Sequence, residues 1–167
     1  MTFAGLALVR SVDTGNLVAG NLAFRQASLH ASDAGVEAAM TALDTIVVTS
    51  LNSNYPAACA VGACSYYAIK QAESPSGVPT VINWNLVPRT VVDGSYAVQF
   101  VVDRMCAGPL PVADIIQKCM HTEGGGVGSK KAGAVSFTSA QQVYFRATVR
   151  VTGPRNTTSL VQAVFAR

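Results

Sequence analysis

The chain has 167 residues, a length that suits one domain, or one domain with an appendage. Hydrophobic residues make up 50% and charged residues only 13%, against about a quarter in an ordinary soluble protein. This composition indicates surface that must be buried against something else. The net charge of +3 is too small and too scattered to indicate nucleic-acid binding.

The first nine residues, MTFAGLALV, are apolar and are followed by Arg10. The run is too short to span a bilayer, which needs about twenty apolar residues. It also lacks the basic start and the cleavage site of a secretory signal. We interpret residues 1–9 as the remnant of a membrane segment whose earlier part is missing.

Residues 6–49 contain no proline and are rich in alanine, which predicts one long helix. A stripe of larger residues recurs every seven positions at Leu22, Leu29, Val36 and Leu43. A second flank carries only small side chains, at Ala27, Ala31, Ala34, Ala38 and Ala42. The later half of the helix should pack on the protein core, and the earlier half should not. Four residues are expected to form the helix-to-sheet core: Val36, Met40, Leu43 and Val47.

Beyond Tyr55-Pro56 the hydrophobic pattern changes from helical to alternating, which predicts an antiparallel sheet of about four strands. Strands are expected at residues 80–87 and 95–104, and a hairpin at 142–153 and 157–167. The hairpin should have one core face and one wet, basic face that carries Arg146 and Arg150. The expected fold class is therefore α+β, with one long N-terminal helix packed against an antiparallel sheet.

Two further segments are predicted between the strands. A short helix is expected around residues 111–120, and a flexible glycine-rich loop at residues 123–133. The loop does not match the phosphate-binding pattern G-x4-G-K-[ST], because a lysine follows Ser129 directly.

The four cysteines are Cys59, Cys64, Cys106 and Cys119. Their gaps, C-x4-C and C-x12-C, differ from the usual start of a zinc site, and neither histidine stands at ligand spacing to them. An even number in loop-like segments predicts two disulfide bonds and an oxidising compartment. Three pairings are possible, and we favour the one that is local in sequence, Cys59–Cys64 with Cys106–Cys119.

No spacing suggests a nucleophile, a base and an orienting group. His30 stands three residues before Asp33 on the predicted helix, which is typical of a surface pair. His121 and Glu123 flank the glycine-rich loop, which is poor support for a preorganised site. We therefore expect no enzymatic activity, no metal, no cofactor and no small-molecule substrate.

The stretch RSVDTGNLVAGNLAFRQASLHASDAGVEAAM, residues 10–40, resembles the N-terminal region of PilX-type minor pilins of type IV pili. In these proteins a membrane helix continues into an M/L-AGN-L-x-x-R-Q-A-x-x-A-A-E-A-G-like stretch. The likeness is carried by Ala19, Gly20, Asn21, Arg25, Gln26, Ala27, Asp33, Ala34, Gly35 and Glu37. Residues 144–167 also resemble the closing hairpin of that family. The two stretches cover about a third of the chain.

The resemblance implies a pilin-like fold and a structural role in assembling or priming a type IV pilus, with a part in a tip complex or in adhesion. Residues 1–25 would be the protruding half of the pilin helix, and residues 26–167 the globular head. The implied partners are other minor and major pilins, a tip adhesin, and the inner membrane through the missing N-terminal helix. The head would lie in the periplasm before assembly and in the extracellular pilus afterwards. The expected assembly face of the helix consists of Leu6, Val12, Leu17 and Val18.

Two alternatives stay open. A minor pseudopilin of a type II secretion system shares this architecture, but such subunits often carry a large helical insertion or calcium ligands. Asp93, Asp103 and Asp114 show no calcium-loop spacing. An independent secreted binding module would require an N-terminal helix buried all round, which the polar residues Arg25 and His30 argue against.

Overall fold

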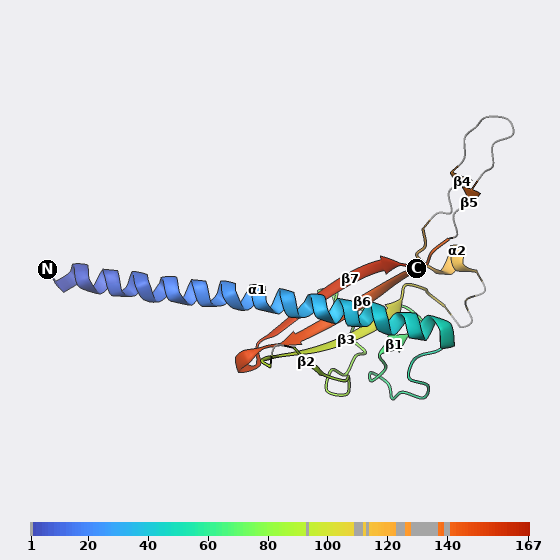
Figure 1. The fold of residues 1–167 in the computed structure, drawn as a ribbon, viewed down its shortest axis with the longest axis horizontal. Coiled ribbons are helices and arrows are strands. Elements are labelled where there is room, and N and C mark those ends of the chain that lie inside the picture. Colours follow the sequence, from blue (N-terminus) through green and yellow to red (C-terminus); the bar gives the residue numbers. More distant parts are fainter. Residues whose placement is uncertain are drawn as a thin grey trace.

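A computed structural model describes most of the chain. The described residues are 2–92, 94–108, 112, 114–122, 126–127, 137–138 and 141–167. Side chains are outside the description at residues 2–9, 47–50, 126–127, 137–138 and 155. Among the described residues a single long helix, α1 (Thr2–Ser50, 49 residues), lies across one sheet, which makes the fold α+β (Figure 1).

The sheet has five strands in the order β1-β3-β6-β7, with β2 also paired to β3. Their bounds are β1 (Tyr66–Tyr67), β2 (Thr90–Val92), β3 (Tyr96–Arg104), β6 (Tyr144–Thr152) and β7 (Thr158–Ala166). All neighbours are antiparallel except β1, which runs parallel to β3, so the sheet is mixed. The predicted strand at 95–104 and the predicted C-terminal hairpin are confirmed.

Four short elements complete the described structure: α2 (Ile115–Lys118), β4 (Gly126–Val127), β5 (Phe137–Thr138) and the 3-10 turn η1 (Pro154–Asn156). The carboxylate of Asp114 accepts from the backbone N–H groups of Ile116 and Gln117, so Asp114 caps α2. Helix α2 lies within the predicted helical segment 111–120. The predicted glycine-rich loop at 123–133 lies outside the described residues, apart from strand β4.

The predicted strand at residues 80–87 is wrong, because this segment is a series of turns. The side-chain Nε2 of Gln99 donates hydrogen bonds to the carbonyl oxygens of Trp84 (2.6 Å) and Val87 (2.7 Å). Two carbonyls that a strand would direct to a neighbouring strand are therefore satisfied by one buried side chain.

Helix α1 contacts the sheet through its small residues. The buried helix residues are Ser28, Ala31, Ser32, Gly35 and Ala39, followed by the larger Leu43 and Ile46. A Cβ atom added to Gly35 would lie only 2.5 Å from Cγ1 of Val149 and 2.7 Å from Cγ1 of Val98. The helix backbone therefore approaches the sheet closely, and the valines of β3 and β6 fill the space against it.

This packing corrects the predicted core. The expectation that Met40 faces the sheet is wrong, because its side chain is 48% exposed. Val36 is half-buried beside the cluster around Val98, Leu43 is fully buried, and the side chain of Val47 is outside the description. Because the helix turns about 100° per residue, the small-residue face and the face of Met40 cannot both point at the sheet.

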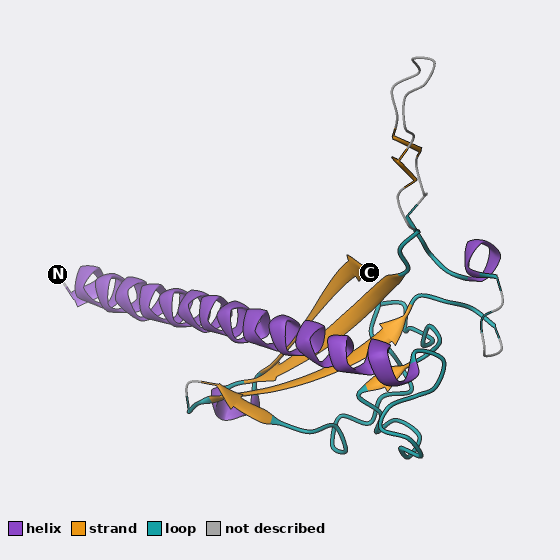
Figure 2. Ribbon diagram, turned by 45° about the vertical axis from the view of Figure 1, so that its right-hand side comes forward, coloured by secondary structure: helices purple, strands orange, loops and turns teal. Residues whose placement is uncertain are grey.

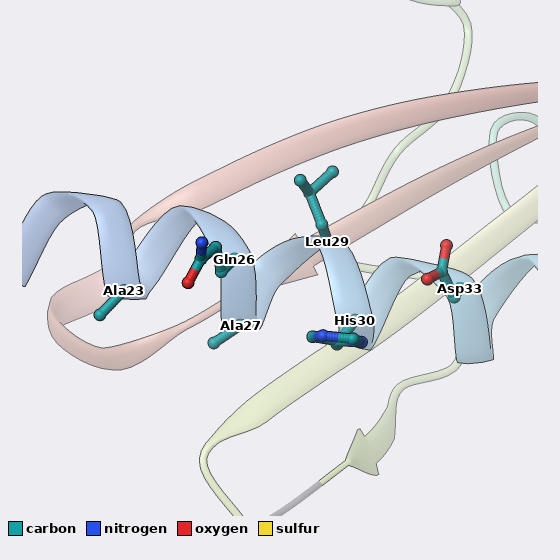
Figure 3. A pocket seen from close by; sticks show the side chains of 6 residues that line it. All are labelled: Ala23, Gln26, Ala27, Leu29, His30 and Asp33. Atoms are coloured by element: carbon teal, nitrogen blue, oxygen red, sulfur yellow. The ribbon is translucent and has the colours of Figure 1, made fainter.

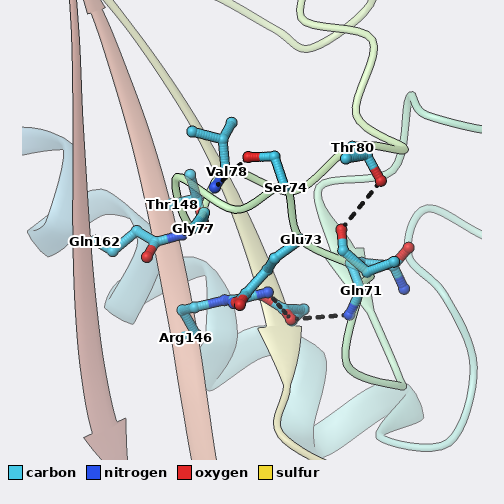
Figure 4. Close-up of polar contacts among 11 residues, drawn as sticks. Gln71, Glu73, Ser74, Gly77, Val78, Thr80, Arg146, Thr148 and Gln162 are labelled. Carbon is cyan, nitrogen blue, oxygen red and sulfur yellow. Dashed lines mark hydrogen bonds and ion pairs between the residues drawn. The ribbon is translucent and has the colours of Figure 1, made fainter.

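The second face of the sheet is also covered, so the predicted wet, basic face is wrong for its centre. The loops between α1 and β2 lie over it, and Arg146 is only 3% exposed. The guanidinium of Arg146 donates to both carboxylate oxygens of Asp103, from Nε to Oδ1 (2.9 Å) and from Nη2 to Oδ2 (2.6 Å). Arg146 also pairs with Glu73, which lies in the loop over the strands (Figure 4).

The carboxylate of the buried pair of Asp103 and Arg146 accepts a further hydrogen bond from the backbone. The backbone N–H of Gln71 donates to Oδ2 of Asp103 (3.1 Å). Burial raises the pKa of Asp103 to about 6, opposed by this N–H and by the charge of Lys70. Burial also lowers the pKa of Arg146. The guanidinium of Arg146 and the N–H of Gln71 both donate to the carboxylate, which therefore bridges the loop at Gln71 to strand β6.

Both disulfide bonds of the favoured pairing are present. Cys59–Cys64 closes a small loop over the second face of the sheet, where Cys64 is buried with Tyr67 and Val101. Cys106–Cys119 joins the segment after β3 to the end of α2.

The close approach at Gly35 gives a paired prediction. The Gly35→Ala variant should lose about 2–3 kcal/mol of unfolding free energy, because two valine side chains must move. This is the net loss, after the roughly 1 kcal/mol that alanine contributes over glycine in helix propensity. Thermal and urea unfolding measure it. The matched control is Gly20→Ala, which meets nothing within 4 Å and should increase helicity without lowering the melting temperature. Equal behaviour of the two variants would contradict the packing.

The ion pair gives a second prediction. Asp103→Asn should cost about 3–5 kcal/mol of unfolding free energy, because Arg146 stays buried, loses its bidentate carboxylate partner and keeps only the partly exposed Glu73. Glu73→Gln should cost at most about 1 kcal/mol, because the Glu73 side chain is 29% exposed and the surrounding water screens the pair. Urea unfolding at neutral pH gives both values. A larger loss for Glu73→Gln than for Asp103→Asn would show that the pair with Asp103 is not the dominant contact.

Candidate assembly surface

The N-terminal half of α1 extends beyond the sheet (Figures 1 and 2). Residues 10–23 are all exposed, and Leu17 is 70% exposed. The helix meets the sheet at Phe24, whose ring centroid lies 6.1 Å from that of Tyr96. A Cβ atom added to Gly153, at the end of β6, would lie 2.6 Å from Phe24 Cε2. The hairpin of β6 and β7 therefore packs tightly against α1 at Phe24.

The four residues expected to form an assembly face do not share one side of the helix. Val12, Leu17 and Val18 are all exposed, but five or six residues separate Val12 from the others, so they point in different directions. The side chain of Leu6 is outside the description. Of these four residues, Val18 also belongs to a longer row of exposed apolar residues on α1.

That row consists of Val18, Leu22, Leu29 and Met40, which we call the apolar line. Its members follow one another at i+4, i+7 and i+11, the spacings that keep side chains on one side of an α-helix. All four are exposed, although Leu29 and Met40 lie where the helix crosses the sheet. The heptad of Leu22 and Leu29 is visible in the sequence, but these side chains face away from the sheet. The signal for the true core face is the row of small residues from Ser28 to Ala39.

Polar side chains interrupt and border the apolar line. Arg25 (i+7 from Val18) and Asp33 (i+4 from Leu29) fall between its apolar members, and Gln26 and Glu37 lie to one side of it. A shallow hollow beside the line is lined by Ala23, Gln26, Ala27, Leu29, His30 and Asp33 (Figure 3). An exposed apolar strip bordered by polar residues is the form of surface that packs against another helix.

The structure does not bring these side chains together as a chemical site. The His30 ring and the Asp33 carboxylate point in different directions (Figure 3). In the portion of the chain that the structure describes, no group of three or more His, Cys, Asp or Glu side chains could hold a metal ion. None of the described helices has a stretch long and hydrophobic enough to span a bilayer.

The fold and surface define a class of protein: an α+β head with one long helix that carries an unpartnered apolar line. Comparison of the chain with family models, with curated proteins and with solved structures found no match. The structural feature from which a function can be proposed is therefore the geometry of α1.

Replacing a leucine by alanine should affect stability differently in the two halves of α1. Leu43→Ala should cost about 2–5 kcal/mol of unfolding free energy, because Leu43 is fully buried against the sheet. Leu17→Ala should change it by less than about 0.5 kcal/mol, as expected for a surface position. Chemical denaturation of the two variants tests this. Equal destabilisation would mean that residue 17 packs within the domain.

Proposed function

We propose that the chain is a structural minor pilin that takes part in assembling or priming a type IV pilus. The observation that carries the proposal is the apolar line on a helix whose N-terminal half extends beyond its own head. The likeness of residues 10–40 to PilX-type minor pilins supports the same role. We also propose that the α+β fold, with its long helix laid across the sheet, is a pilin-like fold.

The division of α1 into a buried face and an exposed face gives the proposal a physical reason. In a filament of this type, subunit helices pack side by side in a central bundle. The buried small residues of α1, from Ser28 to Ala39, already contact the chain's own sheet, with Gly35 at the closest point. Among the described side chains, the apolar line together with Val12 and Leu17 stays exposed and available to neighbours, and burying apolar area is favourable by about 25 cal/mol per Å². We infer that Val18, Leu22 and Leu29 contact neighbouring pilin helices.

In this proposal the head lies in the periplasm while the subunit is held at the inner membrane, and it enters the extracellular pilus on assembly. Other minor and major pilins contact α1, and a tip adhesin binds in the same complex. The two disulfide bonds suit such an oxidising location.

Photo-crosslinking in cells tests the role. A photoreactive amino acid at Leu22 should crosslink the chain to other pilins, and the product should appear in the sheared filament fraction. The control is the same amino acid at Val61, an exposed position in the Cys59–Cys64 loop, which lies outside α1. Immunoblots of the filament and periplasmic fractions measure the outcome. Products at Leu22 no more abundant than at Val61 would overturn the proposal.

The same experiment distinguishes a type IV minor pilin from a pseudopilin of a type II secretion system. Crosslinks from Leu22 to secretion-system pseudopilins, without any product in sheared filaments, would assign the chain to a type II secretion system. A chain that crosslinks to no pilin-like subunit would favour an independent binding module.

A further inference from the structure

Strand β7 forms an open edge of the sheet. It pairs with β6 through nine consecutive residues from Thr158 to Ala166, without a bulge. Among the described residues no strand pairs with its other side, and Figures 1 and 2 show it as the outermost strand. The opposite edge of the sheet is made of β1 and β2, which have only two and three residues.

The hydrogen-bond pattern shows which residues of β7 face this edge. Arg167 and Val143 exchange two backbone hydrogen bonds, of 2.9 and 3.0 Å. Hydrogen-bonded and non-hydrogen-bonded pairs alternate along an antiparallel ladder, so the odd-numbered residues of β7 bond to β6. The even-numbered residues direct their N–H and C=O groups outward: Thr158, Leu160, Gln162, Val164 and Ala166.

Within the part of the chain that the structure describes, strand β7 itself carries none of the sequence features that normally prevent strand pairing. Short strands, charged side chains, prolines and bulges protect most sheet edges, and the sequence TSLVQAVFA contains no charge and no proline. Leu160 is 40% exposed and Val164 is 55% exposed, both on the face away from α1. The short strands protect the β1 and β2 side, whereas β7 is left available.

We propose that β7 pairs with β7 of a second copy of this chain, antiparallel and centred on Gln162. This register overlaps all nine residues and matches outward N–H groups with outward C=O groups. It places Leu160 opposite Val164 of the other copy, which are apolar partners, and Thr158 opposite Ala166. Because the strand carries no charge, no like charges meet across the axis. The product is one continuous sheet, formed by a surface that shares no residue with the apolar line.

A disulfide-trapping experiment tests the register. All native cysteines are bonded, so a cysteine introduced by Gln162→Cys is the only free thiol. Hydrogen-bonded antiparallel partners have Cα atoms about 5.5 Å apart, within the range of a disulfide bond. Mild oxidation of the full chain should give at least tenfold more covalent dimer for Gln162→Cys than for Thr158→Cys. An equimolar mixture of Thr158→Cys and Ala166→Cys should give a mixed dimer. Non-reducing electrophoresis with mass spectrometry measures all three.

A charge variant tests the association without a covalent bond. Gln162→Lys sets two lysines opposite each other and should reduce the dimer fraction in light scattering at least tenfold. Val61→Lys adds the same charge at an exposed position elsewhere and should leave the dimer fraction unchanged. Circular dichroism checks the fold, because Gln162 also donates to the carbonyl of Gly77 (Figure 4). The Gln162→Cys crosslink should persist in a Leu22→Ala background, because Leu22 belongs to the apolar line and takes no part in the pairing of β7.

Three outcomes would overturn the proposal. One is no more dimer from Gln162→Cys than from Thr158→Cys. Another is a dimer that persists unchanged in Gln162→Lys, which would place the association elsewhere. The third is a monomeric chain that crosslinks through position 162 to a different protein.

Discussion

The close approach of α1 to the sheet at Gly35 is the constraint on which the rest of the structure depends. No buried helix residue between Ser28 and Ala39 is larger than serine, so the valines of β3 and β6 pack almost directly against the helix backbone. A larger residue here would move the helix away from the sheet along its length. Because small residues face the sheet between Ser28 and Ala39, the larger Leu29 and Met40 of the apolar line point away from it.

A sheet packed this closely on one face still needs cover on the other. The loops between α1 and β2 supply it, and they are held by polar contacts as much as by apolar ones. Asp103 and Arg146 place a bidentate ion pair under the loop at Gln71, and Gln99 holds the carbonyls of Trp84 and Val87. Irregular segments cannot satisfy one another's backbone groups as strands do, so buried side chains from the sheet take that role.

The sequence predicts most of the helices and strands, but it does not predict which segments pack against each of them. Alternation identifies β3, β6 and β7, and the absence of proline identifies α1. A heptad such as Leu22 and Leu29, however, fits a chain's own sheet or another helix equally well, because periodicity fixes a face and not what covers it. Arg146 shows the same limit in a strand: an outward position predicts water, whereas here a distant loop and Asp103 cover it. At residues 80–87 alternation fails because the turns bury Ile82 and Val87 without any ladder.

The packing of α1 also determines how its apolar line can bind. Where the helix crosses the sheet, at Leu29 and Met40, the line is held in place by the contacts of the opposite face, so binding there orders little additional chain. Residues 10–23, before Phe24, are exposed, and a Cβ atom added to Gly15 or Gly20 would meet nothing within 4 Å. Each glycine weakens the helix by about 1 kcal/mol relative to alanine. A neighbouring helix that packs along the line would therefore bind first to the rigid section and stabilise the free section as contact extends toward Val18. Such contacts would add to the stability of the projecting half, which is helical in the single chain as well.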